Sequence, residues 1–265
     1  MSPAAKAGDD ALSDPRERFS GAAAGYARFR PGYPETLVDW AVAEAAIRAG
    51  GRVADVGCGT GILTRMLAHR GFDVVGLDPN EDMLAEARAD GGGAEYLRGD
   101  AEATGLPGRS VGLVTVAQAF HWFDLDAALG EFHRILVPDG HVAAVWNIRG
   151  EGAFMSAYDG LLRRFSSEYQ VLESWETTLE QLKRHPRVAA PREGWETHAQ
   201  SFDLEGLRGR VWSSSYVRRG VEDREGFDTA LRALFEAHAR GSAVDFPYRT
   251  VALVFRIRPA PGRIS

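Results

Sequence analysis

Cysteine is almost absent from this sequence: Cys58 is the one cysteine among 265 residues. An internal disulfide is therefore excluded, and cysteine usage gives no sign of an oxidising compartment. Long apolar runs are also missing, since no stretch reaches the roughly 18 residues that a membrane-spanning helix needs. The N-terminus lacks the basic and then apolar pattern of a secretory signal. We expect a soluble protein of the cytoplasm.

Basic charge is in deficit as well. The 31 lysine and arginine residues are outnumbered by 37 aspartate and glutamate residues, which gives a net charge of −6. Nucleic-acid-binding domains normally carry a basic patch, so we expect neither nucleic acid nor a membrane as partner. The seven histidines do not recur at metal-binding spacing, so we expect no metal. The 45% hydrophobic content is ample for the core of one α/β domain.

What the sequence does contain is a glycine-rich turn, Asp55-Val-Gly-Cys-Gly-Thr-Gly61, preceded by a short apolar stretch. The pattern predicts a buried strand that runs into a tight turn, and the apolar spacing after Gly61 predicts a helix. Such a turn at a helix N-terminus is typical of nucleotide binding. It reads G-x-G-x-G rather than the G-x-G-x-x-G of dinucleotide sites, and no Lys-Ser or Lys-Thr pair follows to bind phosphates.

A carboxylate ends the next predicted strand. Residues 73–78 form an apolar run that stops at Asp78, and an acid in this position is suited to hydrogen-bonding a ribose diol. A ribose is therefore expected without a pyrophosphate. S-adenosylmethionine (SAM) fits this combination, because it joins an adenosine to an amino acid through a sulfonium and carries no phosphate.

At this point the residues resemble a known family, the class I SAM-dependent methyltransferases, over residues 52–149. The glycine turn is similar to that family's first motif, residues 77–80 to its second and residues 99–102 to its third. Residues 111–119 resemble the strand that ends at the methyl donor. The resemblance implies that Asp78 holds the ribose hydroxyls and that Asp100 meets the adenine amino group. It also implies SAM as cofactor and S-adenosylhomocysteine as product.

A narrower likeness, to the trans-aconitate methyltransferase-like, type 11 small-molecule methyltransferases, comes from residues 26–34 and 117–123. In the resembled enzymes an aromatic and basic arm like residues 26–34 covers the cofactor, although its aromatic side chains are equally suited to pinning the arm to the core. Met83 either contacts the adenine or is an ordinary core methionine. The expected cofactor contacts are Tyr26, Arg30, Asp55, Gly57, Cys58, Gly59, Thr60, Asp78, Pro79, Met83, Asp100, Ala101, Glu102 and Gln118.

The order of predicted elements gives the fold class. Strands separated by helices predict a parallel sheet. Together with the resemblance, this predicts an α/β, Rossmann-like sheet of seven strands, mostly parallel, with the last strand antiparallel and a helical lid inserted after the fifth. We divide the chain into a disordered head (1–15) and one methyltransferase domain, made of an arm and helix (16–50), a SAM-binding core (51–150), the lid (151–195) and a C-terminal part of the sheet (196–265), whose strands are expected at 196–204 and 249–258.

Ligands of open parallel sheets bind where the strands end, so the candidate chemistry lies there. His121, just past the fourth strand, is the candidate general base, because its ordinary pKa lies near neutrality; the alternative is that it packs beside Trp122. Arg30 and Arg149 suit an acidic acceptor, the amino-acid end of the cofactor or a surface ion pair. The candidate acceptor contacts are Trp122, Trp146, Asn147 and Arg149, the two tryptophans being equally suited to the core.

The sequence therefore predicts a SAM-dependent methyltransferase acting on a small molecule, such as a carboxylic acid or a natural-product intermediate. Methylation at oxygen, carbon or nitrogen stays open, and so does the oligomeric state. One alternative is a regulatory protein that binds SAM without transferring its methyl group. Another is a nicotinamide-dependent oxidoreductase, against which the missing third glycine of the dinucleotide pattern counts.

Overall fold

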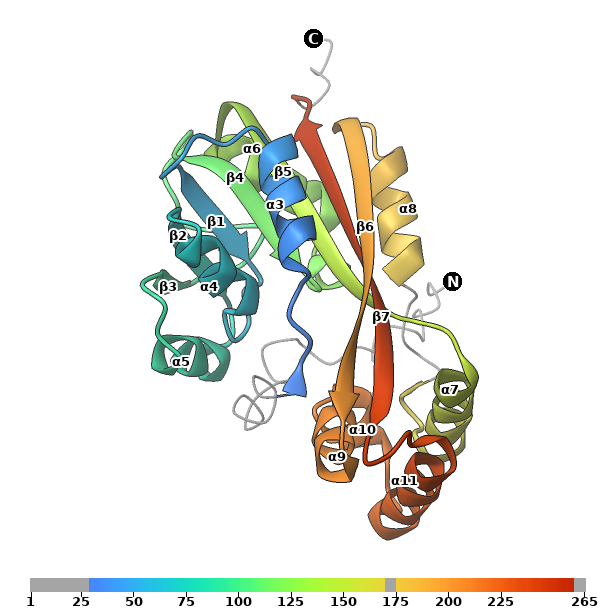
Figure 1. The fold of residues 1–265 in the computed structure, drawn as a ribbon. Helices are drawn as coiled ribbons and strands as arrows, with labels where there is room; N and C mark the ends of the chain where they lie inside the picture. The colour runs from blue at the N-terminus through green and yellow to red at the C-terminus, as the bar shows by residue number, and fades with distance from the viewer. Residues whose placement is uncertain (1–28, 170–174, 260–265) are drawn as a thin grey trace, which may run out of the picture.

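The computed structural model describes residues 29–169 and 175–259, and within them a single seven-stranded sheet carries helices on both faces (Figure 1). The head at 1–15 and Tyr26 lie outside the described residues. The strands are β1 (Arg52–Val56), β2 (Asp73–Asp78), β3 (Glu95–Arg98), β4 (Val111–Ala117), β5 (Leu136–Arg149), β6 (Val188–Phe202) and β7 (Val244–Ile257).

The sheet has the strand order β3-β2-β1-β4-β5-β7-β6. The first five strands pair in parallel, whereas β7 is antiparallel to both of its neighbours. Six strands therefore run in one direction and the last strand of the chain runs against them. The predicted Rossmann-like sheet is confirmed, and the order reverses between β1 and β4, which is where such sheets bind ligands.

Helices cover both faces because the central strands are apolar on both sides. One face is covered by helices α3, α4 and α5: Val53, Val74 and Leu113 pack on α3 and α4, and Tyr96 packs on α5. The other face packs on the short helix η1 and on α6 and α8. Their bounds are α3 (Glu35–Glu44), α4 (Ile62–His69), α5 (Glu81–Ala89), η1 (Phe120–Trp122), α6 (Leu125–Ile135) and α8 (Trp175–Arg184).

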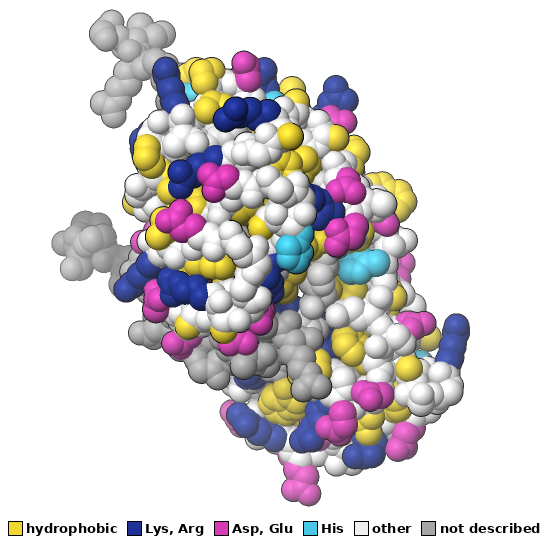
Figure 2. Space-filling model, turned by 60° about the vertical axis from the view of Figure 1, so that its left-hand side comes forward, with side chains coloured by type: hydrophobic (Ala, Val, Ile, Leu, Met, Phe, Trp, Pro, Cys, Tyr) yellow, Lys and Arg dark blue, Asp and Glu magenta, His cyan; other side chains and the backbone are white. Residues whose placement is uncertain are grey.

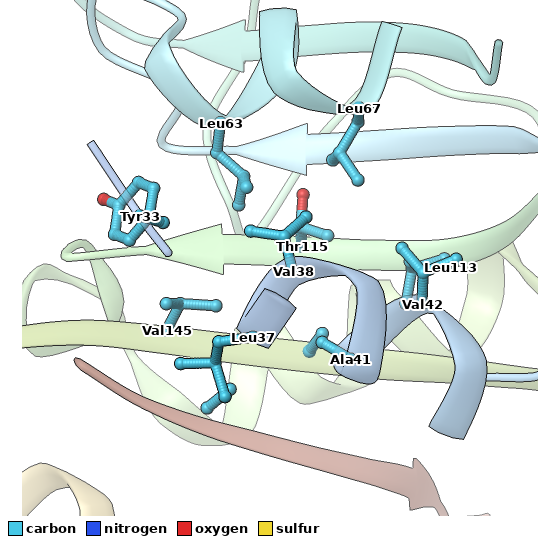
Figure 3. Close-up of a pocket in the computed structure, with 12 residues that line it drawn as sticks. Tyr33, Leu37, Val38, Ala41, Val42, Leu63, Leu67, Leu113, Thr115 and Val145 are labelled. Atoms are coloured by element: carbon cyan, nitrogen blue, oxygen red, sulfur yellow. The ribbon is translucent and has the colours of Figure 1, made fainter. Parts of the chain in front are cut away.

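Helix α3 shows how tightly the first face is closed. Figure 3 shows Leu37 and Ala41 of α3 above the sheet, with Leu63 and Leu67 of α4 beside them. The space that these side chains enclose has a volume of about 10 Å³, no more than a single water occupies. This apolar contact belongs to the core and leaves no room for a ligand.

A second hydrophobic cluster lies beyond the carboxyl ends of the strands. It is formed by α7 (Ala153–Phe165), α9 (Leu204–Trp212), α10 (Ser215–Gly220) and α11 (Arg224–His238), which pack around Tyr158, Phe227 and Phe246 (Figure 1). We call these four helices the cap. The cap thus draws α7 from the segment after β5 and its other three helices from the segment between β6 and β7.

The structure differs from the sequence prediction most after β5. Residues 151–195 were expected to be a helical lid, but α8 lies on the sheet, where Leu179 and Leu182 join the main core. Strand β6 begins at Val188 rather than at 196, and β7 begins at Val244 rather than at 249. Each of these stretches contains a proline, Pro191 or Pro247, a residue that is uncommon inside strands. Pro247 is tolerated because its carbonyl faces β5, where it accepts from the N–H of Gly150 just past the last paired residue, so its missing N–H costs no bond to β6.

The surface carries charges of both signs. In the view of Figure 2, lysine and arginine side chains are interspersed with aspartate and glutamate rather than gathered in one basic patch. Within residues 29–169 and 175–259, none of the helices has the length and apolar character needed to cross a membrane.

Candidate functional site

A cavity of about 990 Å³ lies at the carboxyl edge of the parallel strands, between the glycine turn and the cap. Its walls come from the turns after β1, β2, β3, β4 and β5, from the arm segment before α3 and from the cap. Most predicted site residues line it: Arg30, Gly57, Cys58, Gly59, Thr60, Asp78, Pro79, Met83, Asp100, Ala101, Glu102, Gln118, His121, Trp122, Asn147 and Arg149. Asp55 and Trp146 do not.

The glycine turn has a backbone that only glycine adopts without strain. Gly57 and Gly61 have φ values of 71° and 76°, in the left-handed region. A Cβ on Gly57 would lie 2.5 Å from the Cβ of Ala119, and one on Gly61 would lie 2.5 Å from the hydroxyl of Tyr96. A Cβ on Gly59 would instead meet no atom within 4 Å, so the turn leaves open space on its cavity side.

Asp78 ties the glycine turn to the end of β2. One carboxylate oxygen accepts a hydrogen bond from the backbone N–H of Gly59 at 2.9 Å, and the other accepts from the N–H of Asn80 at 2.9 Å. Each oxygen keeps a second lone pair, so the carboxylate still has acceptor capacity toward the cavity. Burial raises the pKa of Asp78, against the lowering effect of these two hydrogen bonds.

Asp55 lies beneath the turn rather than in the cavity wall, and this corrects the expectation that it contacts the cofactor. Its side chain is buried and accepts hydrogen bonds from Thr64 Oγ1 at 2.6 Å and Thr115 Oγ1 at 2.7 Å. Burial raises the pKa of Asp55 to about 6 even though both hydroxyls act in the opposite direction. The residue joins β1, α4 and β4 under the turn.

The turn after β3 forms the next part of the wall. Asp100 and Ala101 line the cavity together with Met83. Only 3% of Met83 is exposed. Glu102 has a local role in addition, since its carboxylate accepts a hydrogen bond from the backbone N–H of Asp124 at 2.8 Å. That bond fixes the start of α6 beside the cavity.

His121 and Trp122 reach the cavity from η1, immediately after β4. Their rings contact each other, with centroids 4.8 Å apart. Trp146 points to the opposite side of β5: it is 1% exposed and stacks on Phe120 in the main core. The expectation that Trp146 lines an acceptor pocket is therefore replaced by a packing role, because neighbouring residues of a strand face opposite sides of the sheet.

The end of β4 has a strained residue that fixes its neighbours. Gln118 has a φ of 58°, which is unusual for a residue with a side chain, and its Nε2 donates to the carbonyl oxygen of Asn147 at 3.0 Å. Asn147 Nδ2 donates in turn to the carbonyl oxygen of Gly32 at 3.0 Å. Its Oδ1 accepts a hydrogen bond from Thr250 at 2.5 Å. Asn147 thus holds the arm segment against the sheet.

The arm segment also touches the cap. Arg30 Nη2 donates to the carbonyl oxygen of Ser213 at 3.4 Å. The ring of Phe29 lies so close to Gly209 that a Cβ there would be 2.3 Å from it. Tyr26, the other arm residue expected near the cofactor, lies outside the described residues. The arm therefore runs along the cavity between the sheet edge and the cap.

The capped end of the cavity contains residues that the sequence did not single out. Arg210, Tyr216 and Tyr248 line it together with Asp159 and Tyr169. They come from α7 and the segment after it, from α9 and α10, and from β7, and none of these elements carries a recognisable motif. Burial raises the pKa of Tyr216, but the positive charges of Arg149 and Arg210 outweigh it, so that this pKa is lowered from 10.0.

Comparison with known proteins agrees with this geometry. Residues 54–144 match the profile of a family described as "Methyltransferase domain". A methyltransferase of Mycobacterium tuberculosis, whose activity is uncharacterized, is 44% identical over 133 residues, which are 50% of this chain and 53% of that protein. The chain thus spans about half the length of the curated relatives that it matches.

Two further relatives cover more of the chain. An uncharacterized methyltransferase of Schizosaccharomyces pombe is 28% identical over 243 residues, which are 86% of this chain and 92% of that protein. A solved structure from Anaeromyxobacter dehalogenans, assigned as a type II methyltransferase, superposes with a TM-score of 0.64 at 29% identity and covers 88% of this chain and 100% of that one. The narrower likeness to the trans-aconitate enzymes stays a prediction.

The cavity also fits the family's cofactor. Two acids, Asp78 and Asp100, end neighbouring strands, and the glycine turn leaves the space beside Gly59 free for close approach of a ligand. The dinucleotide pattern is absent from the turn, in keeping with a nucleoside that carries no phosphate. Residues 54–144 thus match a methyltransferase domain, and the seven-stranded sheet has the Rossmann-like fold of the methyltransferases that the chain resembles.

Proposed function

We propose that the protein transfers the methyl group of SAM to a small-molecule acceptor. The observation that carries this proposal is the continuity of the cavity. The acids and glycines of the predicted cofactor site line the same cavity as residues of the cap. A volume of about 990 Å³ is at the upper end for ligand pockets, so it has room for a cofactor and a second molecule.

SAM supplies an activated methyl group, which is displaced in line by a nucleophile. The chain's part is to align the two molecules and exclude water. Asp78 and Asp100 are placed to hold the nucleoside, while the cap closes the far side of the cavity. Because the acceptor must enter beneath the cap, a small molecule is favoured over a nucleic acid or a protein segment.

His121 is the residue placed to handle a proton. It lines the cavity directly after β4, where the resemblance puts the methyl donor. An acceptor with a hydroxyl or an acidic carbon needs its proton removed, and an imidazole with an ordinary pKa near neutrality is suited to this. A carboxylate acceptor already carries its negative charge and needs no base. The carboxylic-acid acceptor predicted from the sequence is supported by the arginines at the capped end.

The proposal is tested by mass spectrometry of purified full-length protein incubated with SAM that carries a deuterated methyl group and with a metabolite extract. The expected result is S-adenosylhomocysteine formation that depends on the extract, together with a product that has gained the labelled methyl group. Bound SAM without turnover in any extract would instead favour the regulatory alternative. A crystal with S-adenosylhomocysteine and the identified acceptor would then show which atom accepts the methyl group.

A further inference from the structure

Two guanidinium groups line the capped end of the cavity, and the acid that lines it with them, Asp159, is engaged by other partners. Arg210 on α9 is 5% exposed, and Arg149 at the end of β5 is half-buried. Both line the cavity. In the part of the chain that the structure describes, neither forms an ion pair with a carboxylate, whereas the half-buried Arg65 and Arg70 both do.

The contacts of both arginines are with neutral groups. Arg210 Nε donates to the hydroxyl of Tyr248 at 2.8 Å and Nη1 donates to Ser214 Oγ at 3.2 Å. Its guanidinium carbon lies 5.1 Å from the ring centre of Phe246. Arg149 Nη2 donates to the hydroxyl of Tyr169 at 2.6 Å. Aromatic rings and hydroxyls orient the two cations but do not neutralise them.

The nearest acid is already engaged. Asp159 accepts a hydrogen bond from the hydroxyl of Tyr169 and forms an ion pair with Arg163 at 2.6 Å. Among the described residues, Nε and Nη1 of Arg149 and Nη2 of Arg210 donate no hydrogen bond, so each guanidinium keeps donors for a ligand. A cation held out of water without a counter-ion is costly to a fold, so a bound anion would stabilise both groups.

The position of Arg149 indicates which part of a ligand it meets. Ala117, the last residue of β4, pairs with Val145 of β5, and Arg149 follows four residues later. At about 3.3 Å per residue, this places Arg149 roughly 13 Å further along the strand than the end of β4. On the proposed function, methyl transfer occurs near the end of β4, so Arg149 meets a distant part of the acceptor.

We propose that Arg149 and Arg210 together form a subsite for an oxyanion of the acceptor, either a carboxylate or a phosphate, and that this oxyanion is the acceptor's anchor rather than its methyl-accepting atom. The inference rests on the proposed function and adds the substrate class: an acceptor with an anionic group at one end and a nucleophile at the other. Guanidinium groups suit this role because they bind carboxylates and phosphates with paired hydrogen bonds. Arg210 is then a specificity-determining residue.

Calorimetry on the full-length protein saturated with S-adenosylhomocysteine tests this subsite. The probes are succinate, glycerol 2-phosphate and the neutral ester dimethyl succinate, titrated into wild type, Arg149→Gln and Arg210→Gln. Arg256→Gln is the matched control, because Arg256 is half exposed and pairs with Asp139 at the surface. Arg149→Lys and Arg210→Lys keep the charge while losing the paired donors, and they replace either glutamine variant that does not fold.

We expect wild type and Arg256→Gln to bind at least one of the two anions and not the ester. The ratio of the dissociation constants for succinate and glycerol 2-phosphate then distinguishes a carboxylate site from a phosphate site. Each glutamine variant should bind that anion about 10-fold more weakly or worse, since a hydrogen bond to a charged group is lost. Affinity for S-adenosylhomocysteine should stay within about twofold of wild type, because the subsite lies outside the nucleoside site.

Three results would overturn the inference. The first is that neither anion binds wild type at millimolar concentration, and the second is that the variants bind as well as wild type. The third is that S-adenosylhomocysteine affinity falls together with anion affinity, which would assign the arginines to the cofactor's own carboxylate. Failure of wild type to bind S-adenosylhomocysteine at all would count against the proposed function instead.

Discussion

The backbone N–H of Gly59 donates a hydrogen bond to the carboxylate of Asp78 over 2.9 Å, so the acid at the end of β2 supports the glycine turn at the end of β1. The turn and the predicted ribose site are therefore one unit. A change at Asp78 acts on both the shape of the turn and the contact with a nucleoside, and a cofactor-binding measurement detects their sum.

We predict that Asp78→Asn weakens SAM binding about 10- to 100-fold, because a hydrogen bond between a charged acceptor and a ribose hydroxyl is lost. Asp73→Asn is the matched control, since Asp73 lies at the other end of the same strand with a side chain that is 65% exposed. Isothermal titration gives both dissociation constants. Equal affinities for the two variants would contradict a role of Asp78 in the nucleoside site.

Gly61→Ala should destabilise the protein more than Gly71→Ala. Both residues have positive φ, but a Cβ on Gly61 meets the Tyr96 hydroxyl at 2.5 Å whereas one on Gly71 meets nothing within 4 Å. We expect a loss of about 1–2 kcal/mol for the backbone strain at Gly71 and a further loss of about 1–3 kcal/mol for overpacking at Gly61. Urea unfolding measures both. Equal losses would mean that the turn relaxes around the added methyl group.

The buried carboxyl of Asp55 should make stability depend on pH. Burial raises its pKa from 3.8 to about 6. Between these two pH values the carboxyl keeps its proton in the folded state and has released it in the unfolded chain. The stabilisation is thus present below pH 3.8 and is lost as the pH rises through 6. The total loss is about 3 kcal/mol at most, since one pKa unit corresponds to about 1.4 kcal/mol.

Asp55→Asn isolates this effect because asparagine stays neutral and can still hydrogen-bond with the hydroxyls of Thr64 and Thr115. We expect the unfolding free energy of wild type to fall relative to that of the variant as the pH rises from 4 to 7. Urea titrations at several pH values measure it. A difference that is constant across this range would show that Asp55 titrates at its ordinary pKa.

For His121 the prediction concerns turnover rather than binding. With an acceptor whose nucleophile must lose a proton, His121→Ala should lower kcat about 100-fold and leave the affinity for SAM unchanged. His133→Ala is a matched control, because His133 is exposed on α6. Turnover within twofold of wild type would mean that the acceptor brings its own negative charge and that His121 packs against Trp122.

The SAM-binding half of the fold was readable from the sequence because its determinants are local. Strand β2 has the predicted bounds, Asp73–Asp78, since a buried apolar run between Gly71 and a carboxylate has few alternatives. The glycine turn was predicted from its spacing alone, and positive φ at Gly57 and Gly61 explains that spacing. These features depend on a few adjacent residues.

The cap and the outer strands were harder to predict because their determinants are far apart in the chain. Strand β6 alternates half-buried and exposed residues because it pairs with β7, which lies more than 40 residues later in the chain. It also contains Pro191, a residue more typical of loops. Arg210 gave no signal either, because an arginine within a short amphipathic helix normally faces water. Its burial follows from the hydroxyl of Tyr248, which the sheet brings to it.

The central claim, that the carboxyl edge of this sheet binds a phosphate-free adenosyl compound, is tested most directly by titrating the full-length protein with SAM and, separately, with NADH in a calorimeter. The account predicts saturable binding of SAM at one site per chain, weakened by Asp78→Asn, and no heat from NADH. Saturable binding of NADH with no response to SAM would contradict it.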